Sequence, residues 1–189
     1  EMLPLVNKPL VQYGVEEAQE AGMNNIGFVN GRGKRAIPDH FDISYELEHQ
    51  IKGTGNKDLL TSIRDLIGNN TFSFTPQHEM KGLGHAILSC RSLVGDNAFG
   101  VVLADDYCIG DEEGNGVLKQ MAELYKQFRC SIVAIQEVPE NETHKYGVIA
   151  GESMKDGLYR ITDMVEKPAP EDAPSNLTII GRYILIPNI

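Results

Sequence analysis

The sequence predicts an α/β domain built on a doubly wound, mostly parallel mixed sheet, and two observations support this. Over the first 140 residues, short apolar runs alternate with amphipathic segments of about ten to fifteen residues, which is typical of βαβ units. Beyond residue 140 the helical periodicity stops and three strand-like segments follow, which favours mixed or antiparallel strands late in the chain. The 189 residues suit a single domain, 1–189, since domains have about 100–200 residues.

In the first half of the chain, apolar residues at helical spacing predict helices, and short apolar runs predict strands. The spacing is clearest over 59–67, where apolar side chains recur at i, i+3, i+4, i+7 and i+8 before Gly68-Asn69-Asn70. We expect the other helices over 10–22, 43–51 and 86–94, and strands over 26–29 and 72–75.

The second half is predicted to begin with a buried strand over 99–104, a helix over 117–128 and a β-branched strand over 131–138. Three further strands are expected over 146–150, 158–165 and 178–186. The proline-rich stretch 167–174 between the last two is predicted to be a loop.

Charge and cysteine usage exclude several classes of protein. The chain has 17 Lys+Arg against 27 Asp+Glu, a net charge of −10, which argues against nucleic acid or an anionic membrane as the main partner. Its three cysteines are odd in number and form no C-x-x-C pair, which disfavours a disulfide framework or structural zinc site. No apolar run approaches the roughly 20 residues of a membrane helix, and no signal peptide is evident, so we expect a cytoplasmic protein.

The first candidate site is a pair of acids, Asp105 and Asp106, directly after the predicted strand 99–104. Ligands of open α/β sheets bind beyond the carboxyl ends of the strands, and neighbouring strand residues point to opposite faces. Only one of the two acids should therefore face a crevice, where a carboxylate can hold Mg²⁺ against substrate phosphates. The alternative is that both are solvated turn residues or caps.

The second candidate is the run Lys81-Gly82-Leu83-Gly84-His85-Ala86, which places two glycines before a helix, with Gln77 nearby. Glycines in such a turn allow the backbone to approach a ligand closely, and the amide of Gln77 can both donate and accept hydrogen bonds. A plain strand-to-helix turn is the alternative. His85 has no acid or nucleophile visibly paired with it, which favours a structural role.

The third candidate is Glu166-Lys167 at the end of the predicted strand 158–165, with Tyr146-Gly147-Val148 earlier in the chain. Glu166 can accept hydrogen bonds from sugar hydroxyls, and Lys167 can neutralise a phosphate. Because neighbouring side chains alternate in direction, the two need not serve one group. A surface ion pair is the alternative, worth about 0–1 kcal/mol.

Taken together and in order, these motifs resemble the bacterial UTP–glucose-1-phosphate uridylyltransferases, also called UDP-glucose pyrophosphorylases. The resemblance runs the length of the chain. It is carried by residues 1–10 (EMLPLVNKPL), 81–86 (KGLGHA), 103–106 (LADD), 145–148 (KYGV), 165–168 (VEKP), 173–177 (APSNL) and 180–183 (IGRY).

The resemblance implies a Rossmann-like nucleotidyltransferase fold and transfer of the uridylyl group of UTP to glucose 1-phosphate, with Mg²⁺ and release of pyrophosphate. It implies that Asp105 is a metal ligand and catalytic, with Asp106 as its outward neighbour, and that Lys167 is the cation on the sugar phosphate. The uracil is expected at Gln77 and Gly82, and the glucose hydroxyls at Gly147 and Glu166. Glu1 falls in a motif on the nucleotide side.

Compared with this family, the chain begins after the glycine-rich G-x-G-T-R loop and stops before a C-terminal region that supplies further sugar and metal contacts. We therefore expect an incomplete domain with exposed sheet edges, which binds poorly and is largely inactive alone, whereas the complete protein is expected to be a homo-oligomer. Two alternatives remain open: a thymidylyl- or cytidylyltransferase of the same fold, and a non-catalytic nucleotide-sugar-binding module.

Overall fold

The computed structural model describes residues 1–51, 57–155 and 157–188. Its strands form three sheets within these residues. Near the N-terminus, β1 (Pro4–Leu5) and β2 (Lys8–Pro9) pair antiparallel. The second sheet is the parallel pair of β3 (Asn25–Asn30) and β4 (Thr71–Pro76).

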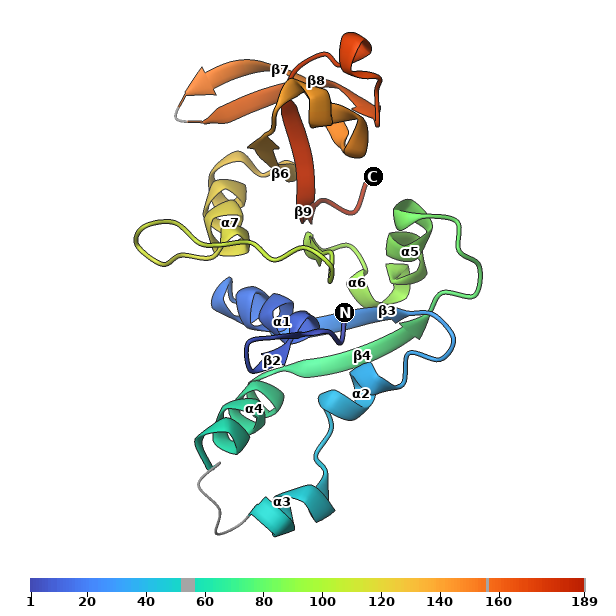
Figure 1. Cartoon of the computed structure of the whole chain (residues 1–189), viewed down its shortest axis with the longest axis vertical. Coiled ribbons are helices and arrows are strands. Elements are labelled where there is room, and N and C mark those ends of the chain that lie inside the picture. Colours follow the sequence, from blue (N-terminus) through green and yellow to red (C-terminus); the bar gives the residue numbers. More distant parts are fainter. Residues whose placement is uncertain (52–56, 156, 189) are drawn as a thin grey trace.

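The third sheet holds the five remaining strands around β9 (Leu177–Leu185), which pairs antiparallel with β5, β6 and β7. These strands are β5 (Phe99–Val102), β6 (Ile132–Glu137), β7 (Gly147–Lys155) and β8 (Leu158–Glu166). Strands β7 and β8 form a hairpin at one end of the molecule, while β3 and β4 lie nearer its middle (Figure 1).

The α/β class is confirmed, and the sheets are mixed, but parallel pairing is less common than expected. Among the described residues, only β3 and β4 pair in parallel, and every pair in the five-stranded sheet is antiparallel. The reason is that β9 runs antiparallel to both β5 and β6 and pairs with each of them. The sequence pattern marks these strands but does not reveal their partners.

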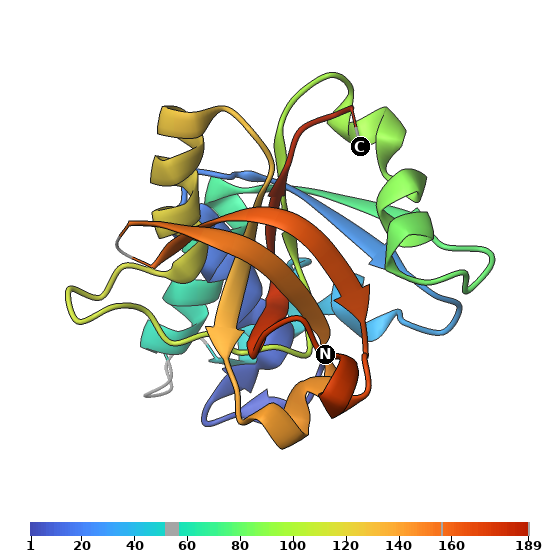
Figure 2. The ribbon, with the colours of Figure 1, turned by 90° about the horizontal axis from the view of Figure 1, so that it is seen from above.

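The helices follow the predicted order with local differences. They are α1 (Leu10–Glu20), α2 (Ala36–His40), α3 (Tyr45–Ile51), α4 (Lys57–Asn69), α5 (Leu83–Ser89), α6 (Arg91–Val94) and α7 (Val117–Phe128), with 3₁₀ turns η1 (Glu140–Lys145) and η2 (Pro170–Asp172). The single helix expected over 86–94 is wrong: it is two helices, α5 and α6, which meet at Cys90, a residue outside helical geometry. In Figures 1 and 2, α7 and the α5–α6 pair lie on opposite sides of the molecule.

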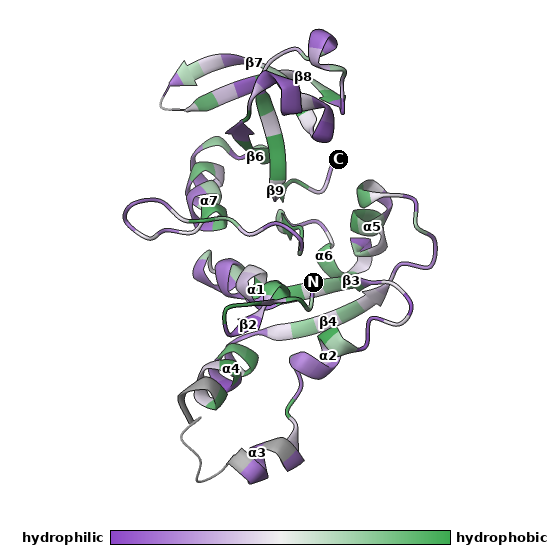
Figure 3. Ribbon diagram, in the orientation of Figure 1, coloured by the Kyte–Doolittle hydropathy of each residue, from purple (hydrophilic) through white to green (hydrophobic). Residues whose placement is uncertain are grey.

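Two apolar clusters meet along α1, whose periodic side chains contribute to both. Val11 and Val15 pack with Phe41 of the segment after α2 and with Leu66 of α4. One turn further on, Ala18 packs against α7 and Ile184 of β9. Strand β9 is accordingly apolar along most of its length (Figure 3). No helix in the described part of the chain is both long enough and apolar enough to cross a membrane.

A buried ion pair connects these parts. Arg182 of β9 is 1% exposed, and its Nε donates to Oε2 of Glu17 on α1 at 2.9 Å. The other carboxylate oxygen of Glu17 accepts a hydrogen bond from the backbone N–H of Leu118 at 3.0 Å, in the first turn of α7. A carboxylate at a helix N-terminus satisfies an otherwise free N–H and complements the helix dipole. Glu17 therefore stabilises the start of α7 in addition to pairing with Arg182.

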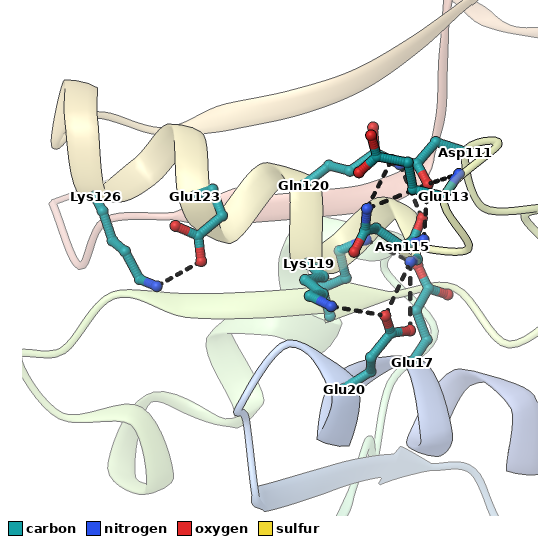
Figure 4. Close-up of polar contacts among 11 residues, drawn as sticks. Glu17, Glu20, Asp111, Glu113, Asn115, Lys119, Gln120, Glu123 and Lys126 are labelled. Carbon is teal, nitrogen blue, oxygen red and sulfur yellow. Dashed lines mark hydrogen bonds and ion pairs between the residues drawn. The ribbon is translucent and has the colours of Figure 1, made fainter.

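Glu20, one turn along α1, reinforces this junction. Its carboxylate accepts a hydrogen bond from the N–H of Gly116 at 3.3 Å and lies 3.4 Å from Nζ of Lys119 (Figure 4). The start of α7 is therefore capped by two carboxylates from a helix about a hundred residues earlier in the sequence. This contact fixes α7 and β9 relative to α1.

We expect Arg182→Leu to lower the free energy of unfolding by about 3–5 kcal/mol, because removing one partner of a buried pair leaves the other charge uncompensated. The matched control is Arg160→Leu, since Arg160 pairs with Glu152 on the exposed surface of the β7–β8 hairpin and such pairs contribute about 0–1 kcal/mol. Urea denaturation of both variants measures the difference, and equal losses would contradict the role given to Arg182.

Candidate active site

A cavity of about 880 Å³ lies between β3 and β5 and extends to their carboxyl ends. Among the described strands, β3 pairs only with β4 and β5 only with β9, so each keeps one edge without a partner strand. This agrees with the expectation of exposed sheet edges. Polar groups gather at the carboxyl ends of the two strands, where Glu1, Asn30, Lys34 and Asp105 line the cavity.

The structure separates the roles of the two neighbouring acids. Asp105 lines the cavity, is exposed and has no hydrogen bond or ion pair with any residue that the structure describes. Asp106 is exposed as well, and its Oδ2 accepts a hydrogen bond from the backbone N–H of Gly181 at 2.9 Å. One carboxylate therefore anchors the turn, and the other is available to a ligand.

The turn that carries Asp105 is fastened to β9. The N–H of Leu103 donates to the carbonyl of Gly181 at 2.9 Å, and the Arg182 guanidinium donates to the carbonyls of Leu103 and Asp106 at 3.4 and 3.0 Å. A β carbon at Gly181 would lie 2.4 Å from Oδ2 of Asp106 and 2.8 Å from Cβ of Leu103, so any other residue would displace this turn. The buried pair of Arg182 and Glu17 thus also positions Asp105.

The donor set at Asp105 fits one kind of metal site. Within the described residues, no group of three or more His, Cys, Asp or Glu side chains could hold a metal ion. Mg²⁺ typically binds to one or two carboxylates and completes its coordination with substrate phosphates and water. A single free carboxylate at a strand end suits that arrangement.

The three residues expected at the sugar are brought together by the β7–β8 hairpin. Gly147 pairs directly with Glu166 across the two strands, and a β carbon at Gly147 would lie 3.2 Å from Oε2 of Glu166. Nζ of Lys167 lies 3.7 Å from Oε1 of Glu166. Both charged side chains are largely exposed, so they are open to a ligand, and the alternative of a surface ion pair remains.

Tyr183 of β9 lies near both candidate clusters, although the sequence motifs did not single it out as functional. Burial raises the pKa of its phenol, and the nearby carboxylates of Asp106 and Glu166 raise it further. Tyr183 is therefore close enough to both candidate clusters to sense their charge. Its phenol keeps its proton to higher pH than an ordinary tyrosine and remains a hydrogen-bond donor.

Gln77 and Gly82 also come together, in the segment between β4 and α5. Nε2 of Gln77 donates to the carbonyl of Gly82 at 3.3 Å and lies 3.1 Å from Nδ1 of His85. Gly82 has a left-handed backbone, with φ of +86°, immediately before α5. The partner of His85 is thus an amide, not an acid or a nucleophile.

The carboxylate of Glu1 forms an ion pair with Lys34, which follows β3 in the run Gly31-Arg32-Gly33-Lys34-Arg35. The hydrogen bond from Lys34 lowers the pKa of Glu1. The ion pair brings a cation of this basic run to the cavity mouth, although the motif analysis had not marked Lys34. The nucleotide role of Glu1 stays a prediction.

Comparison with known proteins places this geometry in a family. A family model described as "Nucleotidyl transferase" matches residues 1–189. A UTP–glucose-1-phosphate uridylyltransferase of Pseudomonas aeruginosa is 67% identical over the whole chain, and the chain spans 67% of its length. The enzyme of the same name from Bacillus subtilis is 43% identical, with 64% of its length covered.

Solved structures agree with the sequence comparison. An apo UDP-glucose pyrophosphorylase superimposes on the whole chain with a TM-score of 0.95 at 57% identity, and the chain covers 68% of that protein. A UDP-glucose pyrophosphorylase in complex with UDP-glucose gives 0.91 at 54% identity, again over the whole chain and 68% of the neighbour. The chain belongs to the nucleotidyl transferase family and, within it, to the group of the UTP–glucose-1-phosphate uridylyltransferases.

Proposed function

We propose that the protein containing this chain transfers the uridylyl group of UTP to glucose 1-phosphate, giving UDP-glucose and pyrophosphate. The observation that carries the proposal is the 67% identity, over the whole chain, to a protein named for this activity. Because the chain spans about two thirds of the length of such relatives, we assign the activity to the complete protein, which we expect in the cytoplasm as a homo-oligomer.

The reaction requires little covalent work from the protein. A phosphate oxygen of glucose 1-phosphate attacks the α-phosphorus of UTP in line, an O–P bond forms, and the bond to the β-phosphate oxygen breaks as pyrophosphate leaves. Positioning of the two substrates and neutralisation of charge can therefore provide most of the rate enhancement. Residues that the structure describes can meet both requirements, the positioning of the substrates and the neutralisation of charge.

Asp105 would hold Mg²⁺ on the phosphates of UTP, where the ion supplies neutralisation of the negative charge that develops during transfer. Its geometry supports this role, since the carboxylate is free at the cavity while Asp106 is bound to Gly181. Lys167 would contact the phosphate of the sugar. In a chain with a net charge of −10, such local cations are needed to admit two polyanionic substrates.

Recognition of the uncharged parts would use the other two clusters. Glu166 would accept hydrogen bonds from glucose hydroxyls beside Gly147, where the absence of a side chain leaves room next to the carboxylate. Gln77 and Gly82 would contact the uracil through an amide and an exposed stretch of backbone. Glu1 would contribute on the nucleotide side through its ion pair with Lys34.

We expect Asp105→Asn in the complete protein to reduce pyrophosphate release from UTP and glucose 1-phosphate by about a hundredfold or more, the typical loss when a transition-state charge contact is removed. The change keeps the shape of the side chain, so the melting temperature should be unaffected. Asp96→Asn is the control, because Asp96 is exposed and lies outside the cavity. Full turnover by the Asp105 variant would refute the metal role.

For sugar recognition, Glu166→Gln should raise the KM for glucose 1-phosphate about tenfold and leave the KM for UTP unchanged, because hydrogen bonds to a charged acceptor are stronger than those to a neutral amide. Initial-rate kinetics with each substrate varied in turn measure the two constants. Glu152→Gln, an exposed change on the same hairpin, is the control. An unaltered profile would return Glu166 and Lys167 to a surface ion pair.

A further inference from the structure

The amide group of Gln77 is held by two acceptors at once. A primary amide has two N–H donors, and Nε2 of Gln77 faces the carbonyl of Gly82 at 3.3 Å and Nδ1 of His85 at 3.1 Å. Both donors are thereby used. Oε1 of Gln77 makes no hydrogen bond with any residue that the structure describes, so the amide keeps one free acceptor.

The contact with Gly82 is one of two that favour this orientation of the amide. A carbonyl oxygen can only accept, so turning the amide over would place Oε1 against another acceptor at about the same distance, and the two would repel. The same orientation determines the state of His85. With the amide in this orientation, Nδ1 of His85 is the acceptor, which corresponds to the Nε2–H tautomer of the imidazole.

Gln77 and His85 are each held in place by hydrogen bonds of their own backbone. The N–H of Gln77 donates to the carbonyl of Asn30 at 2.9 Å, which extends the β3–β4 pairing by one residue. His85 lies in α5, and its carbonyl accepts a hydrogen bond from the hydroxyl of Ser89 at 2.8 Å. The amide of Gln77, which follows β4, is therefore oriented by two groups at the start of α5.

We propose that His85 is a positioning residue that keeps Oε1 of Gln77 directed outward as an acceptor, so that the site selects a pyrimidine base with an imino N–H. Uracil and thymine carry such a donor at N3, whereas cytosine has an acceptor there. The inference rests on the proposed function, in which Gln77 contacts the base. Without the imidazole, the amide loses one of its two restraints and can present its NH₂ group instead.

The test compares UTP with CTP in the complete protein. In His85→Phe, which removes the acceptor and keeps a planar ring, the ratio of kcat/KM for UTP to that for CTP should fall about tenfold or more, since a mismatched buried polar contact carries a penalty of this order. His85→Asn should restore most of the ratio, because the asparagine amide can offer an oxygen near the place of Nδ1. His144→Phe, an exposed histidine on η1, is the matched control.

Two measurements do not depend on turnover. Calorimetric titration with UTP and with CTP should show the same loss of preference in His85→Phe and its recovery in His85→Asn. Long-range ¹H–¹⁵N spectra of the wild-type protein should show His85 as the Nε2–H tautomer. Melting temperatures identify any variant that has lost its fold. If His85→Phe does not fold, the tautomer of His85 in the wild-type protein tests the positioning role instead.

The possible outcomes are distinct. If the wild-type protein fails to form UDP-glucose, the proposed function is wrong, although the tautomer and nucleotide titrations still test the role of His85. If the wild-type protein is active and His85→Phe keeps the same preference for UTP, the positioning role is overturned. An Nδ1–H tautomer would overturn it independently.

Discussion

The buried pair of Arg182 and Glu17 joins parts of the fold that are far apart in the sequence. Glu17 receives hydrogen bonds from Arg182 on β9 and from the first turn of α7, and Arg182 continues to the carbonyls around Asp105. A buried charge is costly unless it is fully paired, so these contacts must form together. The packing of α1, α7 and β9 and the placement of Asp105 therefore depend on one interaction.

Electrostatics divides the carboxylates of this acidic chain into two groups. Several acids accept hydrogen bonds that hold the fold together. Glu17 and Glu20 bind the N-terminus of α7, and Asp106 binds the backbone N–H of Gly181. Asp105 and Glu166 remain open to a ligand. A chain with an unfavourable net charge can thus still provide a phosphate site, because the local arrangement of a few groups decides it.

Local pattern was sufficient for most elements, such as α1, α4 and α7, whose apolar residues recur at helical spacing. It failed where neighbours in space decide the outcome. The helix expected over 86–94 breaks at Cys90. Antiparallel strands were expected late in the chain, but the pattern did not show that β9 would pair with both β5 and β6. Periodicity reports which face of an element is apolar and contains no information about the strand that will lie beside it.

The sequence by itself determined the α/β class, the order of the elements and the motifs that hold Gln77, Asp105, Gly147 and Glu166, because these depend on residue type and local spacing. Tertiary structure decided which of the two acids is free, that Gly147 lies opposite Glu166, and that His85 contacts the amide of Gln77. The physical reason is that a hydrogen bond depends on distance and direction in space. The contact of Asp106 with Gly181 spans 75 residues, and only folding brings its two atoms together.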